Sequence, residues 1–313
     1  MSDTHVYDMI VVGGGPGGYT AALYAARANL STLVLEKLTP GGQMGTTDVI
    51  DNYPGFPEGI GGFELAMQMK QGAERFGAKT ELSEVISVEL KGPVKQVRTQ
   101  GGTYQARTVV LASGAHPREL GLPGEGELRG RGVSYCATCD GMFYRNKTVA
   151  VVGGGNTAVA DVLYLSRLCQ KVYLIHRRDE LRASKVYLDP LQKAGNVEFV
   201  WDSQVQELLY GETVTGVRVK NKKTGQLREL PCDGVFVAVG HIPNTQLLRG
   251  QVELDEAGYV LAGETTKTNL PGVFAVGDLR KKPLRQVVTA ASDGAVAAHF
   301  IEEYFSTTVK ENG

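Results

Sequence analysis

The sequence has few cysteines, almost no net charge and no long apolar run. Its 313 residues include 4 cysteines, and 33 basic residues nearly balance 34 acidic ones, which gives a net charge of -1. A nearly neutral chain has no excess field to attract nucleic acid or an anionic membrane, so we expect neither as a partner. No apolar stretch reaches the roughly 18 residues that a membrane-spanning helix needs. The first ten residues also lack the basic and apolar regions of a signal peptide, and we expect none.

The scarcity of cysteine also argues against a fold held together by disulfides. Four cysteines in a chain of this length do not form a disulfide framework, and we expect a cytoplasmic, reducing environment. There, the C-x-x-C of Cys136 and Cys139 is expected to be catalytic or metal-binding rather than structural. Cys169 and Cys232 have no partner in the sequence, and we interpret them as small core residues.

Glycine, by contrast, is abundant, and two glycine-rich loops each lie between a buried strand and a helix. The first, "GGGPGG" at 13–18, follows a strand at 7–12 and leads through an alanine-rich helix to a strand at 32–35. The second, "GGGNTA", follows a strand at 147–152 and leads through a helix to a strand at 171–175. The pattern indicates a βαβ unit that occurs twice in a diverged internal duplication.

Other segments complete the expected α/β fold. Residues 63–76 and 287–305 have helical patterns, and residues 80–111 alternate like antiparallel strands. We therefore predict two Rossmann-like, three-layer β/β/α dinucleotide-binding domains.

Two similar segments at the expected domain boundaries, which we call the seams, suggest how these domains are connected. "LASGAHP" and "VAVGHIP" each end a strand with Gly and then Pro, which places crossings between domains at 113–117 and 240–244. We predict a first domain made of residues 1–116 and 242–313. Residues 117–241 form a second domain inserted into the first.

The first loop has the spacing of a dinucleotide-binding motif. Gly13 allows the tight turn, Gly15 lets the backbone approach a pyrophosphate, and Gly18 lets helix and strand pack closely, with Pro16 inside the loop. Glu36 ends the next strand, where an acid bonds ribose hydroxyls and repels a 2′-phosphate. The loop therefore predicts FAD or NAD rather than a phosphorylated dinucleotide, and a glycine turn without a ligand is the alternative.

The second loop has the same geometry but a different strand end. Gly153 and Gly155 match the motif, and Ala158 takes the third position, where alanine is allowed. The strand after it ends in basic residues instead of an acid: Arg177, Arg178 and Arg182. Because guanidinium groups grip a phosphate at two points, this site favours NADPH, and a solvated basic patch is the alternative.

The C-x-x-C has three possible functions. A zinc site needs about four ligands, and no second C-x-x-C or suitably spaced histidine supplies them. A thioredoxin-like fold fits poorly, because its motif starts a helix early in a small domain without dinucleotide loops. A redox disulfide that serves a bound flavin is the third, and Asp140 next to it is a candidate acid or base. Asp278, after the strand "VFAVG", is a weaker candidate for contact with a flavin.

The order of these motifs resembles the bacterial low-molecular-weight thioredoxin reductases over essentially the whole chain. The specific matches are "GGGPGG", "PGGQ", "DNYPG", "CATCDG", "GGGNTA", "HRR", "GVFAVGD" and "RQ". The resemblance implies electron transfer from NADPH through FAD and the Cys136–Cys139 disulfide to oxidised thioredoxin or a similar protein. It also implies that Cys139 lies nearer the flavin, that Asp140 exchanges protons with the pair, and that the protein is a homodimer.

The resemblance assigns cofactor-binding residues and no metal ligands. The FAD residues it implies are Gly13, Gly15, Pro16, Gly18, Glu36, Gly41, Gly42, Gln43, Asn52, Gly277, Asp278, Arg285 and Gln286. The NADPH residues it implies are Gly153, Gly155, Asn156, Thr157, Ala158, His176, Arg177, Arg178 and Arg182.

It further implies a rotation of the inserted domain between two states, because dithiol and nicotinamide cannot share one flavin face. Met142 departs from the aromatic residue of many relatives on the surface expected to meet thioredoxin, although Phe143 is retained.

Two other functions remain open at this level. The same scaffold can be reduced by ferredoxin or free reduced flavin, although the NADPH motifs argue against this. A non-catalytic thiol sensor or NADPH-binding module is the alternative from another class.

Overall fold

The protein is described by a computed structural model that covers residues 5–183, 189–191 and 193–311. The ends of the predicted first domain, residues 1 and 313, lie outside these described residues. The chain divides into two compact units, Met1–His116 with Ile242–Gly313 and Pro117–His241. We call them the discontinuous unit and the inserted unit. Among the described residues, no helix has the length and apolar character needed to cross a membrane.

The discontinuous unit is built on a seven-stranded sheet. Its elements are β1 (Val6–Val12), α1 (Pro16–Arg27), β2 (Thr32–Glu36), η1 (Gly42–Thr46), α2 (Gly62–Glu74), β3 (Lys79–Leu82), β4 (Val85–Glu89), β5 (Lys95–Thr99), β6 (Thr103–Leu111), η3 (Gln246–Leu248), β17 (Val273–Ala275), η4 (Gly277–Leu279) and α6 (Val287–Glu311). The strand order is β3-β2-β1-β6-β5-β4, and β17 also pairs with β6.

Pairing in this sheet is parallel on one side and antiparallel on the other. Strands β3, β2, β1, β6 and β17 run parallel, whereas β4, β5 and β6 form an antiparallel meander. The expectation of antiparallel strands over 80–111 is therefore wrong for β3, which lies beside β2. Residues 63–76 connect β2 to β3 through helix α2, and such a crossover suits a parallel pair.

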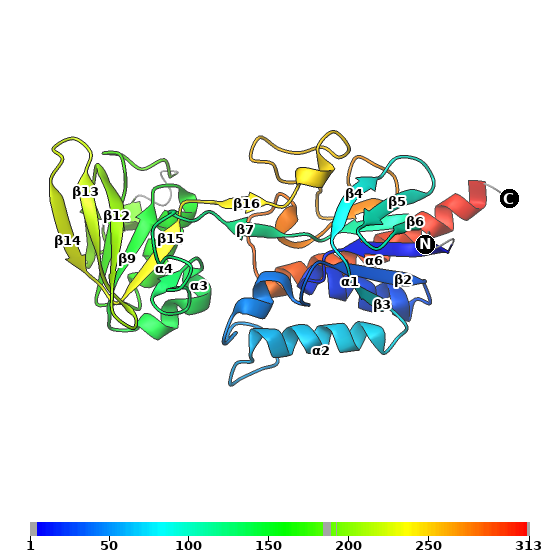
Figure 1. Ribbon diagram of the computed structural model, residues 1–313, viewed down its shortest axis with the longest axis horizontal. Helices are drawn as coiled ribbons and strands as arrows, with labels where there is room; N and C mark the ends of the chain where they lie inside the picture. The colour runs from blue at the N-terminus through cyan, green and yellow to red at the C-terminus, as the bar shows by residue number, and fades with distance from the viewer. Residues whose placement is uncertain (1–4, 184–188, 192, 312–313) are drawn as a thin grey trace. The chain divides into compact units, whose positions relative to one another are not determined.

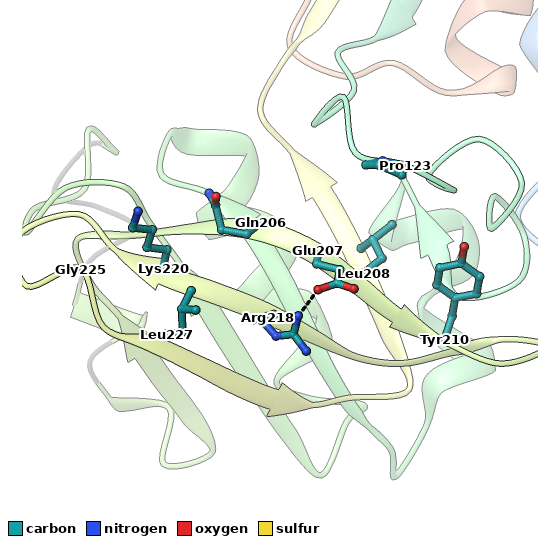
Figure 2. A pocket seen from close by; sticks show the side chains of 9 residues that line it. All are labelled: Pro123, Gln206, Glu207, Leu208, Tyr210, Arg218, Lys220, Gly225 and Leu227. Atoms are coloured by element: carbon teal, nitrogen blue, oxygen red, sulfur yellow. Dashed lines mark hydrogen bonds and ion pairs between the residues drawn. The ribbon is translucent and has the colours of Figure 1, made fainter.

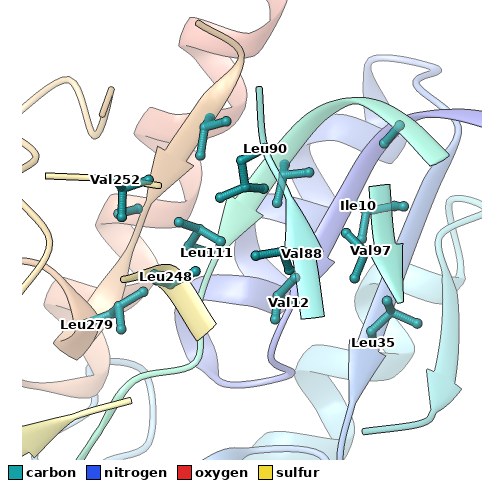
Figure 3. Packing of buried hydrophobic residues seen from close by; sticks show 14 of the residues in the cluster. Ile10, Val12, Leu35, Val88, Leu90, Val97, Leu111, Leu248, Val252 and Leu279 are labelled. Carbon is teal, nitrogen blue, oxygen red and sulfur yellow. The ribbon is translucent and has the colours of Figure 1, made fainter. Parts of the chain in front are cut away.

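Both faces of the sheet are buried, as the alternation along β1 shows. Ile10 and Val12 enter the cluster beneath the meander, whereas Met9 and Val11 enter the cluster beneath the helices. Figure 3 shows the first cluster, in which Leu248 packs with residues of β1 and β4. Helices α1, α2 and α6 cover the opposite face (Figure 1). The unit therefore has three layers: the antiparallel meander, the parallel strands and the helices.

The inserted unit repeats this arrangement. Its elements are β8 (Val133–Ser134), α3 (Ala137–Asp140), η2 (Gly141–Tyr144), β9 (Thr148–Gly153), α4 (Asn156–Leu165), β10 (Lys171–Ile175), β11 (Val197–Val200), β12 (Ser203–Tyr210), β13 (Val214–Asn221), β14 (Leu227–Pro231) and β15 (Gly234–Ala238). The parallel sheet has the order β11-β10-β9-β15-β8, and β12-β13-β14 form an antiparallel sheet.

The core of the inserted unit also has two sides. Along β9, Val149 and Val151 pack with helix α4, while Ala150 and Val152 pack with the antiparallel sheet. The two predicted βαβ units thus have equivalent structures, and the fold class is confirmed.

Two short strands connect the units. β7 (Ala115–Pro117) and β16 (His241–Pro243) pair with each other as a separate two-stranded sheet. The backbone N–H of Asn244 donates to the carbonyl of Gly114 at 3.0 Å. Gly114 has a φ of 68° and Gly240 a φ of 114°, conformations that favour glycine. These connections lie in the two seams marked in the sequence.

Candidate active site

The first glycine loop has the shape of a phosphate cradle. Gly13 has a φ of +106°, and a Cβ there would lie 2.5 Å from the carbonyl oxygen of Ala112. A Cβ on Gly18 would overlap the backbone of Gly13, whereas Gly15 has open space around it. Helix α1 begins directly at Pro16 with no side-chain cap, so its first N–H groups are available to an anion.

Glu36 lies at this loop, as predicted. Its Oε2 accepts a hydrogen bond from the N–H of Gly14 at 2.7 Å, and its Oε1 accepts one from Lys37 at 2.8 Å. The N–H of Gly41 donates to the carbonyl of Gly14 at 2.7 Å, which brings η1, with Gly42 and Gln43, to the same loop. The arrangement fits the ADP half of an unphosphorylated dinucleotide such as FAD.

A second group of predicted residues gathers at the start of α6. The side-chain amide of Asn52 donates to Oε1 of Gln286 at 3.0 Å. Burial raises the pKa of Asp278, although Arg285 and then Lys282 act in the opposite direction. Nε of Arg285 is buried without a hydrogen-bond partner among the described residues, and its guanidinium lies 4.2 Å from the centre of the Tyr259 ring. The buried Nε of Arg285, next to these polar side chains, fits the polar chain of a flavin cofactor.

A network of buried charges holds this group. Asp293 in α6 accepts hydrogen bonds from the N–H of Gly277 at 2.9 Å and from Nε and Nη2 of Arg280 at 2.9 and 2.7 Å. Nζ of Lys282 donates to it at 2.7 Å. Burial alone would raise the pKa of Asp293, but these hydrogen bonds outweigh it and lower the pKa. The network fixes the turn that carries Gly277 and Asp278, and no local sequence pattern announces it.

The second glycine loop repeats the cradle in the inserted unit. A Cβ on Gly153 would lie 2.7 Å from the Cβ of Ala158, so both positions need small residues. Gly155 again has open space around it, and α4 begins directly after it with Asn156 and Thr157 exposed. The loop therefore leads into a helix N-terminus, a position that suits an anion, as the first one does.

His176 lies against this loop. It is 5% exposed, packs on Gly154 and meets the ring of Trp201 edge-on, with 6.5 Å between ring centres. Its Nε2 has no hydrogen-bond partner in the part of the chain that the structure describes. Burial lowers the pKa of His176, and three exposed arginines lower it further, so the neutral ring predominates at neutral pH: Arg182, Arg177 and Arg178. The N–H of Arg182 donates to the carbonyl of Gly154, which places this cationic group at the loop and fits a phosphorylated dinucleotide.

The two redox cysteines form a disulfide in the same unit. Cys136 and Cys139 are bonded, with their Cα atoms 5.3 Å apart, and Cys136 precedes the single turn of α3. Oγ of Ser134 donates to Oδ2 of Asp140 at 2.6 Å, a contact that the sequence did not suggest. Phe143, four residues after Cys139, is 52% exposed.

A buried glutamate orders the segment before the disulfide. Glu125 accepts a hydrogen bond from the hydroxyl of Tyr135 at 2.9 Å, and Tyr135 directly precedes Cys136. The same carboxylate accepts bonds from three backbone N–H groups: those of Leu120, Gly121 and Leu122. One side chain thus fixes a loop and the approach to Cys136.

The other two cysteines are free and buried, which confirms them as core residues. Burial raises the pKa of Cys169 to about 11 and that of Cys232 to about 12. Both remain protonated thiols at neutral pH and are poor nucleophiles.

A surface pocket of about 620 Å³ lies elsewhere, on the antiparallel sheet of the inserted unit. Figure 2 shows Arg218 of β13 paired with Glu207 of the neighbouring strand β12 among the residues that line the pocket, with Tyr210 at one end. None of the predicted site residues lines this pocket.

The predicted residues thus form three groups. The residues predicted to bind FAD all lie in the discontinuous unit, and those predicted to bind NADPH lie in the inserted unit with Cys136, Cys139 and Asp140.

Comparison with known proteins gives concordant results. The family model described as pyridine nucleotide-disulphide oxidoreductase matches residues 7–294. A thioredoxin reductase of Mycolicibacterium smegmatis is 48% identical over 302 residues, which cover 96% of this chain and 97% of the relative. A bifunctional thioredoxin reductase/thioredoxin of Mycobacterium leprae is 48% identical over 96% of this chain and 66% of its own length. The crystal structure of a thioredoxin reductase from Streptococcus pyogenes matches with a TM-score of 0.90 and 43% identity, over 97% of this chain and 100% of that one.

Proposed function

Because the chain belongs to the pyridine nucleotide-disulphide oxidoreductase family, and within it to the thioredoxin reductases, we propose that it reduces thioredoxin with electrons from NADPH by way of FAD. The observation that carries the proposal is the Cys136–Cys139 disulfide, which lies in a unit that also holds a dinucleotide loop. FAD, when bound, would accept a hydride from NADPH and pass two electrons on to this disulfide. Two electrons and two protons convert the disulfide into two thiols, which then reduce the disulfide of thioredoxin by exchange.

The charged side chains at each glycine loop support one cofactor for each unit. Glu36 holds the first loop and would repel a 2′-phosphate, which supports FAD in the discontinuous unit. Arg182 lies at the second loop with two further arginines nearby, which supports NADPH in the inserted unit. Neutral His176 can donate or accept a hydrogen bond at the same place.

Asp140 is proposed to exchange protons with the cysteine pair. Its carboxylate is held by a hydroxyl and lies one residue from Cys139, within reach of small movements of α3. Cys139 is assigned the position nearer the flavin by resemblance to the family.

The proposed partner is thioredoxin or a thioredoxin-like protein. Met142 and Phe143 are 48% and 52% exposed beside the disulfide and offer an apolar contact. The name of the Mycobacterium leprae relative joins the reductase to a thioredoxin, which supports the same class of partner. We also propose a cytoplasmic homodimer, and sedimentation of the purified protein tests the dimer.

Catalysis is proposed to involve rotation of the inserted unit. The dithiol and the NADPH loop belong to one compact unit, so they must take turns at one flavin. The paired connections β7 and β16, with Gly114 and Gly240, are the proposed hinges.

The test begins with anaerobic addition of NADPH to the yellow holoenzyme. We expect the flavin absorbance to bleach, and addition of oxidised thioredoxin to restore it. Cys136→Ser should bind FAD and bleach with NADPH but reduce no thioredoxin. Retained thioredoxin reduction in this variant would exclude the disulfide from the electron path, and a wild-type protein that reduces no thioredoxin from a broad panel would refute the function.

A further inference from the structure

Ser134 connects two parts of the redox site. It is the last residue of β8 and 3% exposed, and it pairs with Phe236 of β15 in the parallel sheet. Because Ser134 pairs in the sheet, its backbone is held from outside the short helix α3. It is therefore a rigid support next to a site whose own turn is only four residues long.

The hydrogen bonds of this hydroxyl have a definite direction. A serine hydroxyl has one proton to donate and two lone pairs. Oγ accepts the backbone N–H of Cys136 at 3.1 Å. It lies 2.6 Å from Oδ2 of Asp140 but 3.4 Å from the carbonyl oxygen of Cys136. Bonds from a hydroxyl to a carboxylate are typically about 2.5–2.7 Å long, so the proton is donated to Asp140.

We propose that Ser134 is a positioning residue that holds Asp140 ionised, and tied to the backbone of Cys136, while the disulfide is closed. A hydrogen bond donated to a carboxylate favours its charged form. Ser134 thereby sets the pH at which Asp140 takes up a proton. The inference rests on the proposed function, in which Asp140 exchanges protons with the cysteine pair.

Other titratable groups surround this site and enter the test. The negative charge of Asp140, after burial, helps to raise the pKa of Tyr144 on η2 to about 12. Burial raises the pKa of Asp161 on α4, the helix against which α3 packs, to about 7. Asp161 can therefore titrate near neutral pH itself and must be separated from Asp140. Within the described part of the chain, Tyr164 of α4 lies against Gly141, and Cys232 and Asp233, before β15, lie near Tyr144.

The test measures the protonation of Asp140 directly. Oxidised holoenzyme carrying isotope-labelled aspartate is titrated by nuclear magnetic resonance, and the Asp140 signal is assigned by its loss in Asp140→Asn. In Ser134→Ala we expect the midpoint of the Asp140 titration to rise by about one pH unit or more. The lost hydrogen bond to a charged group corresponds to at least a tenfold change in the proton affinity of Asp140. Ser134→Thr keeps the hydroxyl and should restore the midpoint. Ser134→Cys, a weak donor of similar size, should shift it in the same direction as alanine.

Two controls separate this role from general loss of packing. Ser203 is also buried in the inserted unit and donates to the carbonyl of Trp201 at 2.7 Å, so Ser203→Ala removes a comparable bond elsewhere. Ser203→Ala and Asp161→Asn should both leave the Asp140 midpoint in place. An unchanged midpoint in Ser134→Ala overturns the proposal, and so does a shift of equal size in Ser203→Ala. A protein in which the midpoint shifts as expected, but which reduces no thioredoxin, refutes the proposed function and leaves the role of Ser134 in setting Asp140 intact.

Discussion

At the scale of single residues, the side chain of Lys95 opposes the stability of the fold. It is 0% exposed, and its Nζ has no hydrogen-bond partner within the described ranges. The ring of Tyr304, with its centre 5.7 Å from Nζ, is a weak substitute for water. Burial accordingly lowers the pKa of Lys95 from its ordinary value of 10.5. An unpaired polar group in the core is a cost that the rest of the packing must offset.

Replacing this side chain should stabilise the protein. We expect Lys95→Met, which keeps the length and apolar volume, to raise the free energy of unfolding by roughly 1–3 kcal/mol. The unfolded chain binds the proton more tightly, so the penalty is complete below the folded pKa and disappears as the pH rises towards 10.5. The gain from Lys95→Met should therefore shrink with rising pH in denaturant unfolding experiments.

Lys147 provides a matched control. Its Nζ lies 5.6 Å from the ring of Tyr144, but its side chain is exposed. Lys147→Met should leave stability nearly unchanged at every pH. An equal increase in the free energy of unfolding in Lys95→Met and Lys147→Met would show that burial of Lys95 is not the cause.

At the scale of elements, α6 is joined to the turn η4 by charge. Asp293 binds Arg280, Lys282 and the N–H of Gly277, and its side chain and that of Arg280 are buried. Removal of one partner from such a network leaves a buried charge uncompensated. Because the network also holds Gly277 beside Asp278, it links stability to the proposed flavin site.

Asp293→Asn should therefore destabilise the protein strongly. We expect a loss of roughly 3–5 kcal/mol in the free energy of unfolding and weaker retention of FAD. The folded pKa of Asp293 lies below the ordinary 3.8, so its contribution is complete above that value and is lost as the pH falls through the folded pKa. The difference in the free energy of unfolding between wild type and Asp293→Asn should accordingly become smaller in acid, as denaturant unfolding at several pH values would show.

An exposed ion pair between Glu303 of the same helix and Lys267 outside it gives the comparison. Nζ of Lys267 lies 3.1 Å from Oε1 of Glu303, with both side chains close to half exposed. Glu303→Gln should cost at most about 1 kcal/mol. If Asp293→Asn lowered the free energy of unfolding by no more than Glu303→Gln does, the role given to the buried network would be contradicted.

At the scale of the whole molecule, the two connections between the units determine what can move. Gly240 has a φ of 114° with open space around it, so an alanine there is strained by its backbone and not by a clash. Gly240→Ala should lower kcat for thioredoxin at least several-fold while FAD and NADPH still bind, as measured by steady-state kinetics and flavin content.

Gly225, in the hairpin between β13 and β14, serves as the control. It has a φ of +74° and open space as well, but it belongs to a hairpin of the antiparallel sheet and to neither connection. Gly225→Ala should leave kcat unchanged. Unchanged kcat in Gly240→Ala would argue against a hinge at this glycine.

Local patterns predicted much of this molecule, and long-range contacts account for the rest. The loops at Gly13 and Gly153 are visible in the sequence because each requires glycine over a few adjacent positions. The direction of β3 was not, because it depends on the strand beside it. Asp293 likewise joins Arg280 across a turn, and Ser134 meets Asp140 across the disulfide. Such contacts form only once the chain has folded, and no fixed spacing in the sequence identifies them.

The paired connections also bear on how such a chain can be assembled. Asn244 donates to Gly114 at 3.0 Å, and Oγ of Ser113 donates to the carbonyl of Asn244 at 2.9 Å. The inserted unit therefore leaves and re-enters the discontinuous unit at neighbouring points, as tolerated domain insertions do. A short glycine linker in place of residues 117–241 would rejoin the cut ends without stretching either strand. We therefore expect that a gene without the codons for residues 117–241 would still encode both parts of the discontinuous unit in an order that can fold.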